Sequence, residues 1–170
     1  MTEPTKRTRR LAGIDIGTLT CRLLIADLPP GVSLKDFRSD RRILRLGEGV
    51  DQTKRLSPAA MDRVIQCLRE WKAIIESYHV DACTAVATSA VRDAANRDEF
   101  LGRVKREVGI DIEVITGDEE ARPATDPPRN ATSARNRLYR LIRLPRRRPA
   151  GSFMISSRSS VNGCPTNRNS

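Results

Sequence analysis

The chain has 170 residues and a formal net charge of +10, which leaves room for one domain with a core of moderate size. Residues 1–122 contain 21 Lys and Arg against 20 Asp and Glu, whereas residues 123–170 contain ten Arg, no Lys and one acid. The four cysteines form no C-x-x-C pair and no apolar run is long enough to cross a bilayer, which argues against a zinc knuckle, a redox dithiol and a membrane protein.

The chain begins with a basic segment followed by two apolar strands. We expect residues 1–10 to be flexible, and we expect strands over Leu11–Ile16 and Cys21–Leu28. The basic segment and the apolar run after it imitate a secretory signal, but Asp15 interrupts the run too early. We therefore expect a cytoplasmic protein with reduced thiols.

The turn between these strands, Asp-Ile-Gly-Thr-Leu-Thr at 15–20, carries groups that suit a bound phosphate. Gly17 lets the backbone approach an anion closely, while the amides and hydroxyls of Thr18 and Thr20 can point at phosphate oxygens. Asp15 could then face a hydrated cation. A tight turn between two buried strands explains the same residues equally well, so the turn alone does not decide.

The next part of the chain predicts an exposed strand and a long helix. Alternating residues from Arg41 to Leu46 predict a third strand that ends at the glycines of residues 47–49. Ser57-Pro58 provides an N-cap and a first-turn proline for a helix of about twenty residues. Its apolar face includes Trp71 and Tyr78, which we interpret as core residues.

Strands and helices then alternate. The predicted segments are a buried strand over Ala82–Thr88, a helical turn over 89–94, a helix over Arg97–Val108 capped by Asn96 and stopped by Gly109, a strand over Ile112–Thr116, and a helix that begins at 117–122. This order predicts an α/β fold in which helices cover a mixed sheet.

Three of these segments together carry a family resemblance. They are Asp15-Ile16-Gly17, the Ala-Thr-Ser-Ala-Val-Arg-Asp-Ala stretch at 87–94, and the Val-Ile-Thr-Gly-Asp-Glu-Glu-Ala-Arg stretch at 114–122, supported by Arg-Leu-Gly-Glu-Gly at 45–49 and Ser-Pro-Ala-Ala at 57–60. In this order they resemble the N-terminal half of the exopolyphosphatase and guanosine pentaphosphate phosphohydrolase (Ppx/GppA) family over residues 11–122. The resemblance implies the actin, heat-shock-70 and sugar-kinase fold, which is ribonuclease H-like and in which two α/β domains close on a phosphate chain.

The resemblance also implies roles for residues in the first turn. Gly17, Thr18 and Thr20 would form the first phosphate loop, with Asp15 turned toward Mg²⁺. The family usually carries asparagine where this chain has Leu19, so we expect one polar contact, to phosphate or to the loop itself, to be missing here.

Two later segments would complete the site. Ser89 and Arg92 would hold phosphate from a second side, since a guanidinium meets phosphate oxygens in pairs. Glu120 resembles the carboxylate that orients and deprotonates the attacking water, and it would share the metal with Asp15. Each residue also has a simpler interpretation: Arg92 as a solvated arginine, and Glu120 as one of two acids that favour a helix N-terminus.

The activity implied is Mg²⁺-dependent hydrolysis of terminal phosphoanhydrides in polyphosphate or guanosine pentaphosphate, and the sequence does not choose between these substrates. A kinase of the same fold is disfavoured by the Glu-Glu-Ala-Arg signature. The family continues into a strand and a glycine-rich Asp-x-Gly-Gly-Gly-Ser loop, which residues 123–170 do not contain. We therefore expect an incomplete domain with impaired activity.

Residues 123–170 differ in composition from the rest of the chain. They hold six of the ten prolines and ten arginines, which predicts a disordered tail or the product of an out-of-frame reading. The alternative function is non-catalytic binding of a polyanion, nucleic acid or polyphosphate, through this tail, with an affinity that falls steeply with salt. The sequence does not predict an oligomeric state.

Overall fold

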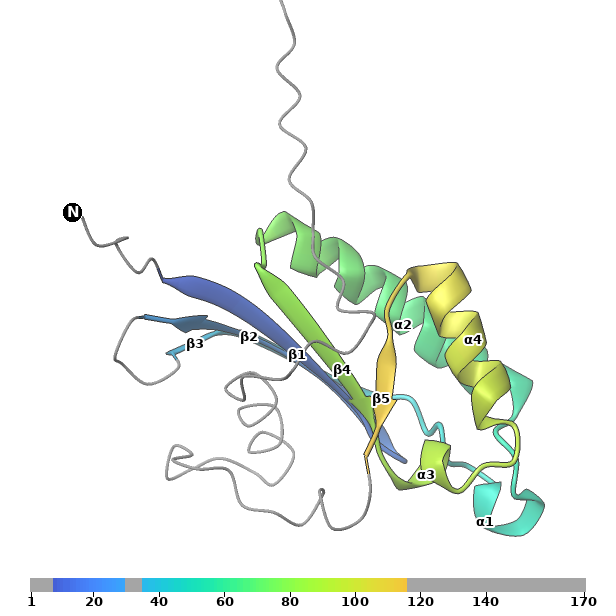
Figure 1. Ribbon diagram of the computed structural model, residues 1–170. Coiled ribbons are helices and arrows are strands. Elements are labelled where there is room, and N and C mark those ends of the chain that lie inside the picture. Colours follow the sequence, from blue (N-terminus) through green and yellow to red (C-terminus); the bar gives the residue numbers. More distant parts are fainter. Residues whose placement is uncertain (1–7, 30–34, 116–170) are drawn as a thin grey trace, which may run out of the picture.

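The computed structural model describes residues 8–29 and 35–115, and the account of the fold concerns these ranges (Figure 1). The elements in chain order are β1 (Arg9–Ile16), β2 (Thr20–Leu28), β3 (Lys35–Ile43), α1 (Val50–Thr53), α2 (Pro58–Ser77), β4 (Ala82–Ala87), α3 (Ser89–Arg92), α4 (Arg97–Val108) and β5 (Ile112–Val114). The short helix α1 is not predicted by the sequence, and β1 begins two residues before the predicted strand.

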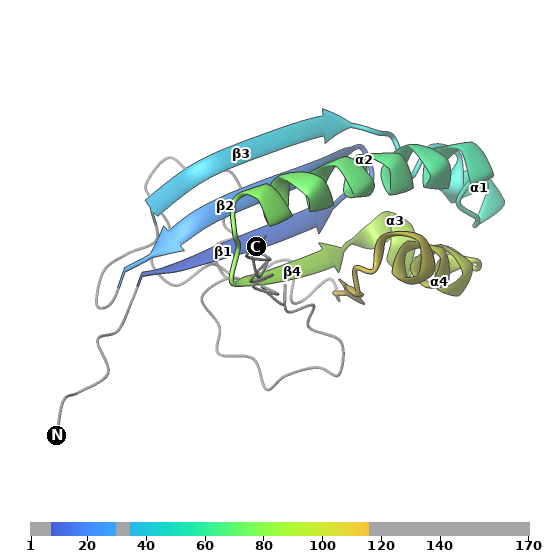
Figure 2. The ribbon, with the colours of Figure 1, turned by 90° about the horizontal axis from the view of Figure 1, so that it is seen from above.

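The strands form one mixed sheet in the order β3-β2-β1-β4-β5. Strand β2 runs antiparallel to β1 and β3, whereas β1, β4 and β5 are parallel. Figure 2 shows β1 to β4 side by side with α2 lying over them. Because β1 pairs with β2 on one side and β4 on the other, it joins the antiparallel and parallel halves, and the predicted mixed sheet is confirmed.

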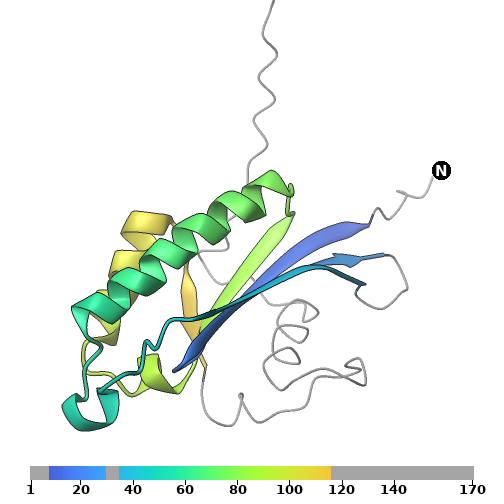
Figure 3. The same cartoon turned by 180° about the vertical axis from the view of Figure 1, so that it is seen from behind.

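Helices α2 and α4 lie on the same side of the sheet (Figures 1 and 3). Alternate residues of β1, namely Ala12, Ile14 and Ile16, face them and belong to one buried core with Trp71 and Phe100. Both of those aromatic side chains are fully buried. The apolar periodicity therefore predicts the packed face of α2 correctly.

The caps of α2 and α4 explain why their predicted bounds are accurate. Ser57 Oγ accepts a hydrogen bond from the Ala60 N–H at 3.2 Å, as expected for an N-cap. Gly109 ends α4 in a left-handed conformation with φ of 76°. Both signals depend on local backbone geometry, which the sequence specifies directly.

Asn96 is the N-cap residue of α4 as predicted, but its side chain does not cap the helix. Its side chain makes no capping hydrogen bond to α4. The amide instead exchanges two hydrogen bonds with the backbone of Leu56: the Leu56 N–H donates to Oδ1 at 2.8 Å, and Nδ2 donates to the Leu56 carbonyl at 3.0 Å. Asn96 is 8% exposed, so this contact ties the segment before α2 to the start of α4 within the protein interior.

The predicted position of the third strand is also wrong. The structure has β3 over Lys35–Ile43 rather than over 41–46. Its helix-facing residues are polar and bind α2 and its C-cap through side chains: Arg38 Nη1 donates to Tyr78 Oη at 2.9 Å, Trp71 Nε1 donates to Asp40 Oδ2 at 2.8 Å, and Arg42 pairs with Glu70. An apolar alternation therefore does not mark this strand. Charged residues on an edge strand also disfavour pairing with another chain.

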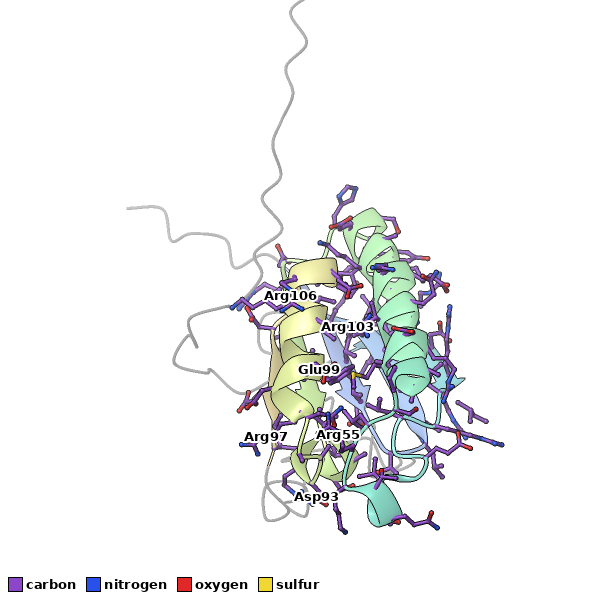
Figure 4. All side chains as sticks on the ribbon, turned by 90° about the vertical axis from the view of Figure 1, so that its right-hand side faces the viewer. Arg55, Asp93, Arg97, Glu99, Arg103 and Arg106 are labelled. Carbon is purple, nitrogen blue, oxygen red and sulfur yellow. The ribbon has the colours of Figure 1, made fainter. Side chains whose placement is uncertain are left out.

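The outer surface of the helical layer carries ion pairs. Figure 4 shows Arg103 of α4 in the strip between α4 and α2. Its guanidinium contacts Asp62 of α2 at 2.8 Å and Glu107, one turn further along α4, at 3.0 Å. Within the described ranges, no helix is both long and apolar enough to span a membrane.

Candidate functional site

The ends of three parallel strands meet at one edge of the sheet. The Thr88 N–H donates to the Ile16 carbonyl at 3.1 Å, and the Ile115 N–H donates to the Ala87 carbonyl at 3.0 Å, so the carboxyl ends of β1, β4 and β5 are adjacent. Helices α1 and α3 lie at this same end (Figure 1). Open α/β sheets bind ligands at the carboxyl ends of their strands, so this edge is the place to look for a site.

The turn between β1 and β2 is closed by a hydrogen bond from the Gly17 N–H to the Thr20 carbonyl at 3.0 Å. A Cβ atom at Gly17 would lie 3.0 Å from that same carbonyl oxygen. A side chain at this position would therefore crowd the carbonyl that closes the turn. Thr18 and Leu19 are exposed at its tip, and 61% of Leu19 is accessible.

Two of the predicted phosphate ligands lie together at this edge. Thr18 Oγ1 and Ser89 Oγ are 3.1 Å apart, within hydrogen-bond distance, although the residues are 71 positions apart in the chain. Ser89 is the first residue of α3, directly after β4 and its Thr88 link to β1. The fold thus brings the turn of the first hairpin against the start of α3.

Asp15 lies one residue before the end of β1 and is 2% exposed. It stands in register with Arg22 of β2 and Val86 of β4, and alternation along β1 places it on the face opposite α2 and α4. A carboxylate at the end of a strand is a ligand type that suits Mg²⁺, which takes oxygen ligands and keeps several water or phosphate ligands. In the part of the chain that the structure describes, no three His, Cys, Asp or Glu side chains form a metal cluster.

Cys21 lies in β2 just after the turn but is not a candidate nucleophile. Burial, with smaller contributions from Cys67 and Asp15, raises the pKa of its thiol far above the ordinary value. Burial also raises the pKa of Cys67 to about 12. Both thiols therefore stay protonated at neutral pH, and only the thiolate is strongly nucleophilic.

Arg92 is the last residue of α3, and its side chain reaches toward the end of β5. Its Nε donates to Asp93 Oδ1 at 3.0 Å, and its Nη1 lies 3.5 Å from the Ile115 carbonyl oxygen. It lines a shallow pocket of about 370 Å³ with Arg97 and Leu101. Figure 4 shows Asp93 and Arg97 at this corner of the molecule.

Glu120 lies outside the described residues, as do residues 123–170, so the predictions made for them stay predictions. The last described residue, Ile115, is five positions before Glu120 and hydrogen-bonds to the end of β4.

The sequence interpretation missed one participant at this edge, the loop over residues 44–49. The Leu44 and Arg45 N–H groups both donate to the Leu19 carbonyl at 3.0 Å, and the Gly47 N–H donates to the Thr18 carbonyl at 2.9 Å. From the sequence, this stretch marks the end of a strand and supports the family resemblance, with no place at the site predicted for it. The paired glycines, Gly47 and Gly49, were the available signal of a close backbone contact.

Comparisons with known proteins agree with this arrangement. The model of the Ppx/GppA phosphatase family matches residues 24–126. Exopolyphosphatase 2 of Mycobacterium tuberculosis is 42% identical over 120 residues, which cover 66% of this chain and 38% of that protein. The match to the family model includes Ser89, Arg92 and Glu120 and begins within β2, after the turn over residues 15–20.

Solved structures show the same fold. The crystal structure of the Aquifex aeolicus Ppx/GppA family member superposes with a TM-score of 0.66 at 44% identity, covering 69% of this chain and 38% of that one. An exopolyphosphatase structure from Cytophaga hutchinsonii gives a TM-score of 0.63 at 34% identity, with 66% and 36% covered. The chain thus spans less than two fifths of the length of these proteins. The expected α/β fold of this family is confirmed, and the chain belongs to the Ppx/GppA phosphatase family.

Proposed function

We propose that this chain binds the phosphate chain of polyphosphate or guanosine pentaphosphate at the carboxyl edge of the sheet and promotes Mg²⁺-dependent hydrolysis of its terminal phosphoanhydride. The observation that carries the proposal is the pair of hydroxyls, Thr18 Oγ1 and Ser89 Oγ, 3.1 Å apart beside the end of β1. Family membership supports it, since the M. tuberculosis relative is named an exopolyphosphatase.

Binding in this proposal depends on donors from two sides. Gly17 lets the turn approach phosphate oxygens, and the hydroxyls of Thr18, Thr20 and Ser89 donate to them. Arg92 lies at the neighbouring corner of the molecule, where its side chain donates to Asp93. If that hydrogen bond is exchanged for one to phosphate, its guanidinium supplies a planar, permanently charged donor. Hydrogen bonds to a charged acceptor contribute roughly twice as much as neutral ones, which suits a polyanionic substrate.

Hydrolysis in this proposal needs one proton acceptor. Glu120 orients a water in line with the terminal phosphorus and accepts its proton as the new P–O bond forms. The bridging oxygen leaves with the bonding electrons, which gives orthophosphate and a chain shortened by one phosphate. A positioned general base of this kind contributes on the order of 100- to 10,000-fold in rate.

Asp15 and Glu120 would hold Mg²⁺ in this site, together with water and substrate oxygens. When bound, the ion supplies charge neutralisation at the phosphoryl oxygens. The buried position of Asp15 favours this role, because a buried carboxylate interacts more strongly with a cation than an exposed one. Impaired turnover and a cytoplasmic location also remain proposals.

The direct experiment measures orthophosphate released by the full chain from polyphosphate and from guanosine pentaphosphate, with MgCl₂ or with EDTA. Glu120→Gln should lower the rate with MgCl₂ about 100- to 10,000-fold, since it removes the base and changes a metal ligand, and it should bind polyphosphate like wild type in EDTA, since the phosphate ligands remain. Glu119→Gln, one position away, is the matched control and should stay near the wild-type rate. Equal effects of the two variants would contradict the role of Glu120.

The alternative proposal, polyanion binding by residues 123–170, has its own observation, namely ten arginines against one acid. Binding by charge alone weakens steeply with salt. A full-length variant with the ten tail arginines replaced by glutamine separates the two proposals. If polyphosphate binding disappears in that variant and persists in Ser89→Ala, the tail binds the polyanion.

A further inference from the structure

The loop over residues 44–49, here called the bracing loop, holds the phosphate-binding turn through its backbone. Three of its N–H groups donate to two carbonyls of that turn, those of Thr18 and Leu19. Arg45 adopts a left-handed conformation with φ of 50°, which is unusual for a residue with a side chain. The adjacent N–H groups of Leu44 and Arg45 converge on the Leu19 carbonyl at this bend.

Gly47 is the residue of the bracing loop that packs most tightly against the site. A Cβ atom built on it would lie 2.3 Å from Thr18 Cγ2 and 3.0 Å from Ala90 Cβ. Its φ is outside the left-handed region, so backbone strain is not what requires glycine at this position. Glycine is therefore required here by the lack of space between Thr18 and Ala90.

We propose that Gly47 is a positioning residue of the phosphate site, because its missing side chain allows Thr18 to sit against Ser89. Thr18 and Ala90 belong to the two segments that supply the paired hydroxyls, and Gly47 lies between them. The expected effect of Gly47 on phosphate binding rests on the proposed function. The packing of Gly47 against Thr18 and Ala90 does not depend on a ligand.

The shape of the threonine side chain explains why a methyl group at position 47 would disturb the site. The Cγ2 and Oγ1 atoms of Thr18 share one Cβ, so a rotation that moves Cγ2 away from a new methyl also moves Oγ1 away from Ser89. Ala90 on the other side blocks the new methyl from moving away instead. The expected result is a turn that keeps its fold and loses the hydroxyl pair.

The test compares Gly47→Ala, Thr18→Ser and the double variant in the full chain. Thr18→Ser keeps the hydroxyl and removes Cγ2, the atom that lies 2.3 Å from the new methyl. Titration with inorganic polyphosphate and Mg²⁺ should show Gly47→Ala binding about tenfold more weakly, the scale of one hydrogen bond to a charged group. The double variant should recover to within about threefold of Thr18→Ser, because the tightest contact is gone and only contacts of 3.0 Å or more remain around the new methyl.

Gly102→Ala in α4 is the matched control, since its Cβ would meet only the end of the Arg106 side chain, at 3.2 Å. It should leave polyphosphate binding unchanged. Binding by Gly47→Ala equal to wild type, or no recovery in the double variant, would overturn the positioning role.

A wild-type chain that fails to bind polyphosphate would overturn the proposed function instead. In that case, urea denaturation without ligand still tests whether Gly47 is required by its packing against Thr18. The double variant must unfold at higher urea concentration than Gly47→Ala alone, and the absence of such recovery overturns the packing role.

Discussion

The helix-covered face of the sheet and the carboxyl edge of its strands are built in different ways. The face is closed by apolar side chains, with Trp71 and Phe100 fully buried against β1 and its neighbours. The edge is assembled from backbone hydrogen bonds and small polar side chains of the first turn, the bracing loop and α3. Substitutions on the face should therefore change stability, whereas substitutions at the edge should change binding.

The largest expected effect lies on the face. Phe100→Ala removes a fully buried ring between α4 and the sheet and should lower the free energy of unfolding by about 3 to 5 kcal/mol. Urea denaturation followed by Trp71 fluorescence measures this change. A loss below about 1 kcal/mol would mean that α4 is not packed as described.

The next effect lies at the edge. Ser89→Ala removes one of the paired hydroxyls and should weaken polyphosphate binding about tenfold, since it deletes a hydrogen bond to a charged group. Its effect on the unfolding midpoint should be small because Ser89 is only half-buried. Ser77→Ala, at the last residue of α2, is the control for calorimetric titration and should bind like wild type.

Asn96→Ala tests whether a buried polar residue away from the Thr18–Ser89 hydroxyl pair changes stability without changing binding. It would leave the Leu56 N–H and carbonyl without their side-chain partners, which should cost about 1 to 3 kcal/mol of unfolding free energy. Polyphosphate affinity at a temperature where the variant is folded should not change. A tenfold loss of affinity would show that the face and the edge are not independent.

The smallest effect is expected from Asp27, at the far end of β1 and β2. The hydrogen-bonded ion pair with Arg10, at 2.8 Å, holds the pKa of Asp27 below its ordinary value of 3.8. A lowered folded-state pKa stabilises the protein above the unfolded pKa, and this contribution is lost as pH falls through the folded pKa. Asp27→Asn should thus lower the Tm at pH 7 and have less effect at pH 2; equal shifts at both values would contradict this interpretation.

Local signals in the sequence were sufficient for most of the helical layer. Ser57-Pro58 and Gly109 mark helix ends through caps that involve only nearby residues, so the bounds of α2 and α4 could be predicted. The course of β3 could not, because Arg38, Asp40 and Arg42 face α2 through polar contacts rather than through apolar alternation. Periodicity predicts burial only where burial is apolar.

The edge was predictable only in part. The resemblance indicated Thr18 and Ser89 as members of one site, and the fold places their hydroxyls 3.1 Å apart. The paired glycines at 47 and 49 signalled a close backbone contact, but the partners of Gly47, Thr18 and Ala90, could not be predicted because they depend on how three distant segments pack. The role of Glu120 stays a prediction from the sequence.

The most direct test of the proposed site is an NMR titration of the ¹⁵N-labelled full chain with inorganic polyphosphate and Mg²⁺. We predict that the largest changes in amide chemical shift fall on Gly17 to Thr20 and on Ser89, where the turn and α3 meet. Changes confined to residues 123–170 would contradict the site and favour binding by the arginine-rich tail.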